Sequence, residues 1–340
     1  MRQTVLKSRA PVRLDFSGGW TDVPPFSEEV GGAVVSASIN RYTYSTVKFL
    51  AKNKIKLISS DYNMVVEANN QALLKYDGNL DLIKAAIKRL KLKTGLELYI
   101  RSDAPPNSGM GTSASAGVCL IGTLNRMQSA KMTFHEIANL ARQLELEELE
   151  IAGGRQDQFS AAFGGINFIE FKDPQVLLSP LKLSDSIICE LEKQLVLCYT
   201  GISRMSGNII SKVMGQYVKR NFKTVDALYN LKRIAIEMKI ALLNDDVEKF
   251  GVLLGENWEN QKKLHESVTN PTIDRIFKLA KKNGAIGGKA LGAGGGGCLL
   301  FFCEQNSEQK MKKVLQDQNL QIIDFNFEFR GLQTWKTLLK

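Results

Sequence analysis

Two glycine-rich segments of the chain contain residue types that bind phosphate groups, and the first is residues 105–115. It reads Pro-Pro-Asn-Ser-Gly-Met-Gly-Thr-Ser-Ala-Ser and runs into an apolar segment, residues 116–124, for which we predict a helix. A loop of Gly, Ser and Thr at the start of a helix offers unpaired backbone N–H groups and the positive end of the helix dipole. This segment therefore predicts a phosphate-binding loop.

The second segment, residues 289–298, reads Lys-Ala-Leu-Gly-Ala-Gly-Gly-Gly-Gly-Cys. It matches GxGxxG, but a dinucleotide-binding motif of that form follows a strand and opens a helix. Here a helix is predicted before the loop and a strand after it, and no GxxxxGK[ST] motif occurs. Alone, this segment predicts a tight hairpin. Together, the two loops indicate an enzyme that uses a nucleotide.

The composition favours a soluble enzyme of two domains. The 340 residues exceed the size of one ordinary core, and 44% of them are hydrophobic and 24% charged. We find neither a secretory signal nor an apolar run that would span a bilayer, and the five cysteines form no CxxC pair. We therefore expect buried, reduced cysteines in a cytoplasmic protein with no membrane partner.

A formal net charge of +10 admits nucleic acid as a partner. The basic residues are scattered among acidic ones, however, so we favour an enzyme with anionic substrates and expect no nucleic-acid partner. The only two histidines, His135 and His265, are interpreted as an ordinary helical residue and a solvated one. A catalytic proton acceptor is therefore expected to be a carboxylate.

Hydrophobic periodicity predicts the elements that position these loops. A break near residues 175–195 predicts a division into domains 1–185 and 186–340. Predicted helices cover residues 82–90, 133–150 and 273–282, and predicted strands cover residues 96–100, 195–199, 298–302 and 323–329.

Three segments together resemble a known family. They are residues 11–25 (Pro-Val-Arg-Leu-Asp-Phe-Ser-Gly-Gly-Trp-Thr-Asp-Val-Pro-Pro), residues 105–115, and residues 153–158 (Gly-Gly-Arg-Gln-Asp-Gln). In this order they resemble the galactokinase, homoserine kinase, mevalonate kinase and phosphomevalonate kinase superfamily. The resemblance implies an α+β fold, with an N-terminal mixed sheet with helices, a ferredoxin-like C-terminal domain, and an active site in the cleft between them.

Within that superfamily, the first and third segments are most similar to the D-glycero-D-manno-heptose 7-phosphate kinases. This implies ATP- and Mg²⁺-dependent phosphorylation of the anomeric O1 of a small-molecule sugar phosphate. An L-fucokinase-like enzyme acting on an unphosphorylated sugar is one alternative, and a non-catalytic sensor of sugar and ATP is another. The sequence does not predict the oligomeric state.

The resemblance assigns catalytic roles to Asp157 and Arg13. A carboxylate at Asp157 can accept the proton of the acceptor hydroxyl and orient its oxygen, and Arg13 is expected beside Asp157 and the transferred phosphoryl group. Simple N-capping of the next helix is the alternative role for Asp157. A surface position on a strand is the alternative for Arg13.

The same resemblance assigns residues to ATP and Mg²⁺. Ser113 and Glu145 are the expected metal ligands, although Glu147, Glu148 and Glu150 compete with Glu145. N-capping is the alternative role for Thr112 and Ser113. The expected ATP-binding residues are Pro106, Ser108, Gly109, Met110, Gly111, Thr112, Ser113 and Ser115.

The acceptor is expected to bind the first segment and two positions of the second domain. A carboxylate at Asp22 suits hydroxyl recognition, and Trp20 is expected either to stack on the sugar or to belong to the core. Arg204 is a candidate for the phosphate of the substrate, with a surface turn as its alternative role. The expected substrate-binding residues are Gly18, Gly19, Trp20, Asp22, Arg204 and Gly294.

Overall fold

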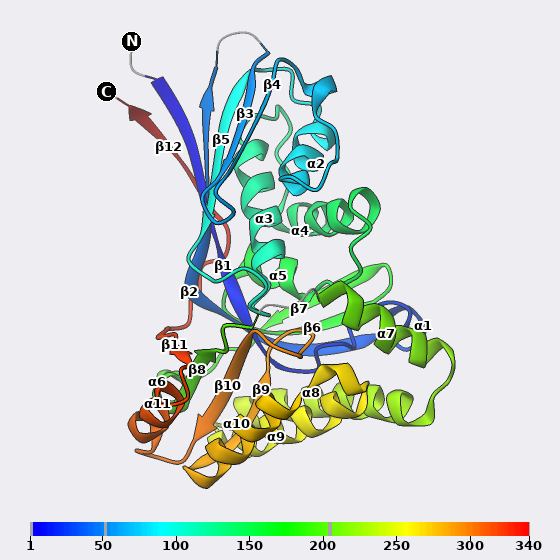
Figure 1. Ribbon diagram of the computed structural model, residues 1–340, viewed down its shortest axis with the longest axis vertical. Helices are drawn as coiled ribbons and strands as arrows, with labels where there is room; N and C mark the ends of the chain where they lie inside the picture. The colour runs from blue at the N-terminus through cyan, green and yellow to red at the C-terminus, as the bar shows by residue number, and fades with distance from the viewer. Residues whose placement is uncertain (1–2, 51–52, 203–205, 340) are drawn as a thin grey trace.

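The computed structural model describes residues 3–50, 53–202 and 206–339, and two β-sheets organise it (Figure 1). Two long antiparallel strands, β1 (Gln3–Ser17) and β2 (Gly32–Phe49), form the centre of the first sheet. The burial of β2 changes along its length: its first half is buried on both faces, and its second half alternates between buried and partly exposed. The second half of β2 therefore has only one face in the core.

The first sheet has eight strands in the described part of the chain. One end of β2 pairs with β5 and the other with β6, and β3 runs parallel to β5 while the other pairs are antiparallel, so the sheet is mixed. The remaining strands are β3 (Ile55–Ser59), β4 (Met64–Ala68), β5 (Leu96–Ser102), β6 (Ile166–Lys172), β7 (Gln175–Pro180) and β12 (Gln333–Leu339).

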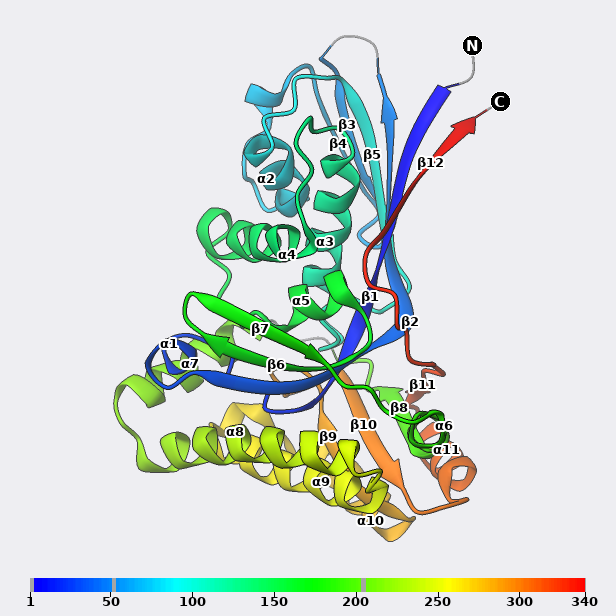
Figure 2. The ribbon, with the colours of Figure 1, turned by 180° about the vertical axis from the view of Figure 1, so that it is seen from behind.

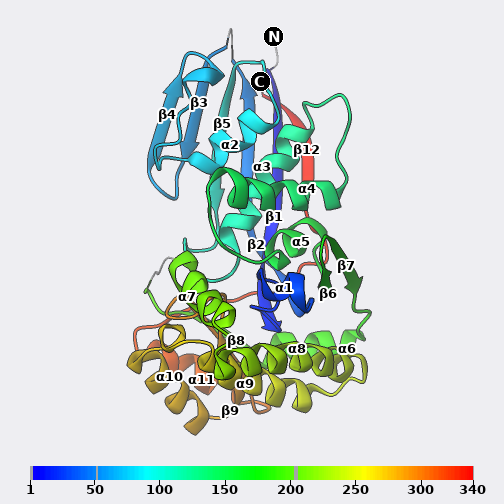
Figure 3. The ribbon, with the colours of Figure 1, turned by 90° about the vertical axis from the view of Figure 1, so that its right-hand side faces the viewer.

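Helices pack against one face of this sheet, as Figure 3 shows. The helix α3, for which the sequence predicted residues 116–124, lies directly over β1 and β2. The helices on this face are α2 (Asp81–Arg89), α3 (Thr112–Asn125), α4 (Phe134–Gln143) and α5 (Gln156–Phe163), and the short elements nearby are α1 (Phe26–Glu29), a 3-10 turn η1 (Gln71–Leu73) and a π-helical turn η2 (Leu144–Glu148).

The second sheet has the strand order β11-β8-β10-β9, with all neighbours antiparallel. Numbered along the chain, this is the order 4-1-3-2 with helices after the first and third strands, which is the ferredoxin-like arrangement expected from the sequence. Its elements are α6 (Asp185–Gln194), β8 (Leu195–Tyr199), α7 (Ser206–Val218), α8 (Phe222–Leu243), α9 (Val247–Lys263), η3 (Glu266–Val268), α10 (Pro271–Lys282), β9 (Ala285–Ala290), β10 (Cys298–Cys303), α11 (Glu308–Gln316) and β11 (Gln321–Ile322).

The last strand returns to the first sheet, where β12 pairs with β1 (Figure 2). The domain boundary near residue 185 stays a prediction, but residues 333–339 belong to the first sheet rather than to the second domain. The strand predicted at 323–329 is wrong, because only Phe327 forms an isolated bridge, to Ile39. Ile323, Phe325 and Phe327 pack against the core as an irregular segment, in which Phe327 contacts Phe16, whereas Phe329 is exposed.

The helix predicted at residues 133–150 is interrupted. Thr133 forms the capping box with Glu136 that its spacing suggests, but the α-helix ends at Gln143 and a π-helical turn, η2, follows. This turn buries Glu145, although its neighbours Leu146 and Glu147 are exposed. Turns of this kind occur frequently at functional sites.

Four of the five cysteines are buried, as expected, and Cys189 is exposed. Across residues 3–50, 53–202 and 206–339, no helix combines the length and the apolar character needed to cross a membrane.

An ion pair and two glycine contacts join the sheets. The Nζ of Lys289 in β9 lies 2.8 Å from Oδ2 of Asp15 in β1, and the two side chains are 0% and 2% exposed. A Cβ on Gly109 would lie 2.5 Å from the Leu291 carbonyl oxygen, and a Cβ on Gly297 would lie 2.6 Å from the Ser108 carbonyl oxygen. The two glycine-rich loops therefore touch backbone to backbone, as only glycine allows.

We predict that Lys289→Met destabilises the protein by about 3–5 kcal/mol, because it leaves the Asp15 carboxylate buried without its cation. Lys312→Met removes the partly exposed pair of Lys312 with Asp324 and should cost less than about 1 kcal/mol. Chemical denaturation of both variants measures these losses. Similar small losses for the two variants would contradict the importance of the buried pair.

Candidate active site

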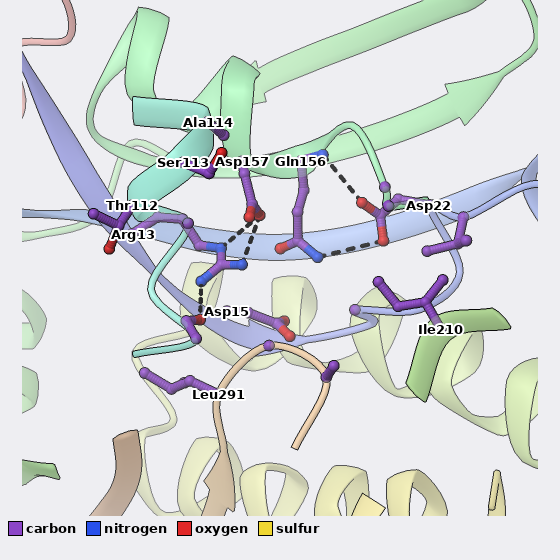
Figure 4. Close-up of a pocket in the computed structure, with 18 of the residues that line it drawn as sticks. Arg13, Asp15, Asp22, Thr112, Ser113, Ala114, Gln156, Asp157, Ile210 and Leu291 are labelled. Carbon is purple, nitrogen blue, oxygen red and sulfur yellow. Dashed lines mark hydrogen bonds and ion pairs between the residues drawn. The ribbon is translucent and has the colours of Figure 1, made fainter. Parts of the chain in front are cut away.

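A cleft opens where the two sheets meet, and it contains about 1130 Å³ of space including the part open to solvent (Figure 4). Both glycine-rich loops line it, together with the segments 13–23 and 151–158. The lining residues are Arg13, Asp15, Gly19, Trp20, Asp22, Val23, Asn107, Ser108, Gly109, Gly111, Thr112, Ser113, Ala114, Glu145, Ile151, Ala152, Gly153, Gly154, Gln156, Asp157, Gln158, Ile210, Leu291, Gly292, Ala293, Gly294 and Gly296.

Arg13 and Asp157 form an ion pair inside this cleft. The Nη2 and Nε atoms of Arg13 lie 2.6 and 2.8 Å from Oδ1 of Asp157, and Nη1 donates to the Gly109 carbonyl at 2.5 Å. Arg13 is buried, whereas the Asp157 side chain is 26% exposed on the cleft side. Asp157 is the second residue of α5 and does not cap it, and Arg13 is not a surface residue. The alternative roles of both residues are therefore excluded.

The backbone amides at the start of α3 are open to the cleft. Gly111, with φ of 71°, holds the N-cap position, and no side chain of the described residues caps the helix. A Cβ on Gly111 would lie 2.9 Å from the Asp157 carboxylate, so glycine lets the carboxylate approach the helix start. Thr112 and Ser113 line the cleft instead of capping. Such a helix start offers N–H groups and a positive dipole to an anion.

Three of the residues predicted to bind ATP lie elsewhere. The Met110 side chain is fully buried in the core. Near the cleft, only its backbone carbonyl takes part, as acceptor of a hydrogen bond from the Arg13 backbone N–H. The Ser115 hydroxyl donates to the Ala10 carbonyl in the interior, because the fourth residue of α3 turns away from the helix start. Pro106 is partly buried but does not line the cleft.

Ser113 and Glu145 lie close together, as the resemblance implied. The Ser113 hydroxyl donates to Oε1 of Glu145 at 2.6 Å, and the Gln158 amide donates to Oε2 at 2.6 Å. Burial raises the pKa of Glu145, and the charge of Arg142 opposes that effect. Glu147, by contrast, is exposed and pairs with Arg89. Only Glu145 of the competing glutamates lines the cleft.

A hydroxyl and a carboxylate are hard oxygen ligands, so this pair fits Mg²⁺. In the described ranges no group of three or more His, Cys, Asp and Glu side chains forms a metal site by itself. This agrees with the usual binding of Mg²⁺ through one or two protein ligands together with phosphate groups and water.

Asp22 is held by backbone amides at the start of α5. Its Oδ2 accepts from the N–H groups of Arg155 and Gln156 at 2.9 and 3.0 Å. A Cβ on Gly154 would lie 1.8 Å from this oxygen, so that position must be glycine for Asp22 to dock. Burial raises the pKa of Asp22 to about 6, and the charges of Asp157 and Asp15 add to the effect while the Gln156 amide opposes it.

The other predicted substrate residues divide into two groups. Gly19, Trp20 and Gly294 line the cleft. Trp20 also belongs to the core, as one of its two expected roles required, and its stacking on a sugar stays a prediction. Gly18 does not line the cleft: its N–H donates to Asn257 at 3.0 Å, and its φ of 80° makes it a turn residue. Arg204 lies outside the described residues.

The sequence did not single out several residues of the cleft. Three of them lie within the segments that resemble the family, close to residues that were assigned roles: Asp15, Gln156 and Gln158. Their polar side chains were the signal from which a place in the cleft could have been predicted. Lys289 opens the second glycine-rich segment, but no local pattern predicts that its partner lies in β1.

The fold and the site define a class of proteins, the two-domain small-molecule kinases. The model of the GHMP kinases N terminal domain matches residues 81–165, and the model of the GHMP kinases C terminal matches residues 238–319. The chain belongs to the GHMP kinase family, and it is a phosphotransferase of that family.

One relative within this family covers almost the whole chain. The D-glycero-alpha-D-manno-heptose 7-phosphate kinase of Campylobacter jejuni is 34% identical over 97% of this chain and 99% of its own length. The crystal structure of a D-glycero-D-manno-heptose 1-phosphate kinase from Bacteroides thetaiotaomicron is 31% identical, with a TM-score of 0.82 over 98% of this chain and 99% of the other. The galactose complex of Lactococcus lactis galactokinase, 22% identical, shares the fold with a TM-score of 0.79 over 97% and 95% of the chains.

We predict that Asp22 makes the folded protein less stable as the pH rises. The ordinary pKa of this carboxyl is 3.8, and burial raises the pKa to about 6. The folded state therefore binds more protons than the unfolded state between these values, so stability falls as the pH rises from about 4 to about 6 and stays lower above that. The full difference corresponds to about 3 kcal/mol.

Urea unfolding at pH 4 and pH 7 measures this effect, with Asp22→Asn as the variant that cannot ionise. Between the two pH values, the wild type should lose up to about 3 kcal/mol relative to Asp22→Asn. Asp317→Asn, at an exposed position, should follow the wild type. The same pH dependence in all three proteins would contradict the raised pKa of Asp22.

Proposed function

We propose that this kinase transfers the γ-phosphoryl group of ATP to the anomeric O1 of D-glycero-D-manno-heptose 7-phosphate and gives the 1,7-bisphosphate. The observation that carries the proposal is the Arg13–Asp157 pair beside the uncapped start of α3. It brings a carboxylate for the acceptor hydroxyl and a cation for developing charge next to amides that bind phosphate. Phosphoryl transfer depends on such positioning and electrostatic stabilisation.

The choice of acceptor rests on the relatives. The Campylobacter jejuni protein is named a heptose 7-phosphate kinase, while the Bacteroides thetaiotaomicron protein is named a heptose 1-phosphate kinase. We favour O1 of the 7-phosphate because the relative with that name is more similar. The L-fucokinase/L-fucose-1-P guanylyltransferase of Bacteroides fragilis is 26% identical, and this chain spans 36% of its length. It keeps L-fucose as the second acceptor to test.

Mg²⁺ is the proposed cofactor beside ATP, with Ser113 and Glu145 as its protein ligands. A metal ion bound there would neutralise charge on the ATP phosphates. Glu145 accepts hydrogen bonds from neutral groups only, the Ser113 hydroxyl and the Gln158 amide, which supports a role as a cation ligand. We also propose a cytoplasmic location, which the buried, unpaired cysteines support. For the phosphate of the acceptor, Arg204 remains the candidate from the sequence.

ADP release with MgATP tests the function on a panel of acceptors. We expect the highest kcat/KM on D-glycero-D-manno-heptose 7-phosphate, compared with the heptose 1-phosphate, mannose 6-phosphate, L-fucose and galactose. Asp157→Asn should lower kcat by about 100- to 10,000-fold, because it removes the proton acceptor, and should leave ATP affinity near that of the wild type.

The panel separates the alternatives. Preference for a neutral sugar would agree with a kinase but contradict the proposed acceptor. Preference for the heptose 1-phosphate would show that a hydroxyl other than O1 is phosphorylated. Release of no ADP with any acceptor would favour the non-catalytic sensor. Near-wild-type turnover by Asp157→Asn would contradict the assignment of the proton acceptor.

For the metal, we predict that Glu145→Gln raises the Mg²⁺ concentration needed for half-maximal velocity by about ten-fold or more, because the amide replaces an anionic ligand. Glu147→Gln makes the same change on an exposed side chain of the same turn and should leave that concentration unchanged. Titration of Mg²⁺ at saturating ATP measures both. Equal Mg²⁺ requirements in the two variants would remove Glu145 from the metal site.

A further inference from the structure

Four side chains that line the cleft each keep a buried polar atom without a hydrogen-bond partner among the described residues. These atoms are Oδ1 of Asp15, Nε1 of Trp20, Oε1 of Gln156 and Oε1 of Gln158. Buried polar atoms are rarely left unpaired in folded proteins, because an unmade hydrogen bond costs free energy. An unpaired atom of this kind on a side chain that lines a binding cleft is a candidate for a hydrogen bond with a ligand.

The orientation of the Gln156 amide follows from its contact with Asp22. Its Nε2 lies 3.4 Å from Oδ1 of Asp22, and a carboxylate can only accept hydrogen bonds. The amide nitrogen must therefore face Asp22, which turns the oxygen, Oε1, to the other side. Gln156 thus has an unpaired acceptor atom, Oε1, and the residue is only 6% exposed.

This acceptor lies between the two carboxylates that the site offers to a sugar. In Figure 4 the Gln156 amide stands between Asp157 and Asp22, with its oxygen on the side of Asp157 and Arg13. Asp157 is assigned to the reacting hydroxyl, and Asp22 to recognition of another hydroxyl of the sugar. A side chain between them is placed for a hydroxyl next to the reacting one.

We propose that Gln156 determines acceptor specificity by accepting a hydrogen bond from the hydroxyl adjacent to the one that is phosphorylated. The inference rests on the proposed function: with O1 as the reacting atom, the adjacent group is the C2 hydroxyl. A pocket that hydrogen-bonds a hydroxyl discriminates against an analogue without it, because the buried partner then stays unpaired. Gln156 would therefore select sugars with a hydroxyl at C2 and reject 2-deoxy sugars.

Gln158 offers a matched comparison two residues further along α5. It has the same side chain, is also buried, and also leaves its Oε1 without a partner in the described ranges. Its amide nitrogen, however, donates to Glu145 at 2.6 Å, so it belongs to the metal side of the cleft. The same substitution at the two positions should thus separate acceptor recognition from support of the metal ligand.

The experiment compares kcat/KM for D-glycero-D-manno-heptose 7-phosphate and for its 2-deoxy analogue. The wild type should prefer the parent sugar by about 10- to 100-fold, and Gln156→Met should reduce that preference to within about three-fold. Gln158→Met should raise the Mg²⁺ requirement and keep the wild-type preference. The intrinsic effect of removing the C2 hydroxyl is common to all variants, so the change in preference isolates the contact.

Thermal melting establishes that each variant is folded, and Gln156→Asn, which withdraws the amide by one methylene group, gives a second route to the same loss of preference. An unchanged preference in folded Gln156→Met or Gln156→Asn would overturn the inference while leaving the proposed function intact. Loss of preference in Gln158→Met to the same extent would also overturn it. Absence of turnover by the wild type on the parent sugar would overturn the proposed function itself and the inference with it.

Discussion

Four carboxylates line one cleft of this protein and repel one another. The site therefore depends on the cation or the hydrogen-bond donors that stabilise each of them. Asp157 is paired with the guanidinium of Arg13, and Asp15 with the buried ammonium of Lys289. Asp22 accepts two backbone N–H groups, whereas Glu145 is bound by neutral side chains. Because each partner differs, the four carboxylates have different electrostatic environments. In the proposed function, Asp157 orients the acceptor, Asp22 binds the sugar and Glu145 binds the cation, while the Asp15–Lys289 pair joins the two sheets.

The groups that stabilise these carboxylates come from both domains, so the site forms only when the two sheets are packed together. Lys289 is the first residue of one glycine-rich segment, and Gly109 belongs to the other. Backbone contact between these loops fixes the distance across the cleft, which a side chain at Gly109 or Gly297 would increase. The Asp157 carboxylate then lies against Gly111, at the start of α3.

The positions of Arg13, Asp22, Ser113 and Asp157 in the cleft could be predicted from short segments, because each of them belongs to a local motif. The predictions that failed depended on information the segments lack. A motif does not reveal which residues of a helix turn inward, so Ser115 was assigned to ATP although it faces the interior. Alternating hydrophobic residues form a strand only if a partner strand lies beside them. In the described structure, residues 323–329 have no partner strand beyond the bridge at Phe327. The Lys289–Asp15 pair joins residues that are 274 positions apart, beyond any local pattern.

The pairing of β12 with β1 has a consequence for how the protein is made. Arg9 and Gln333 are 324 positions apart, yet they face each other across this edge of the sheet and their side chains are hydrogen-bonded. During synthesis on the ribosome, residues 3–9 of β1 therefore keep the backbone groups of this edge unpaired until residues 333–339 have emerged. An exposed strand edge is a template for pairing with other chains. The edge of β1 at residues 3–9 is thus open to pairing with other chains until β12 is available to cover it.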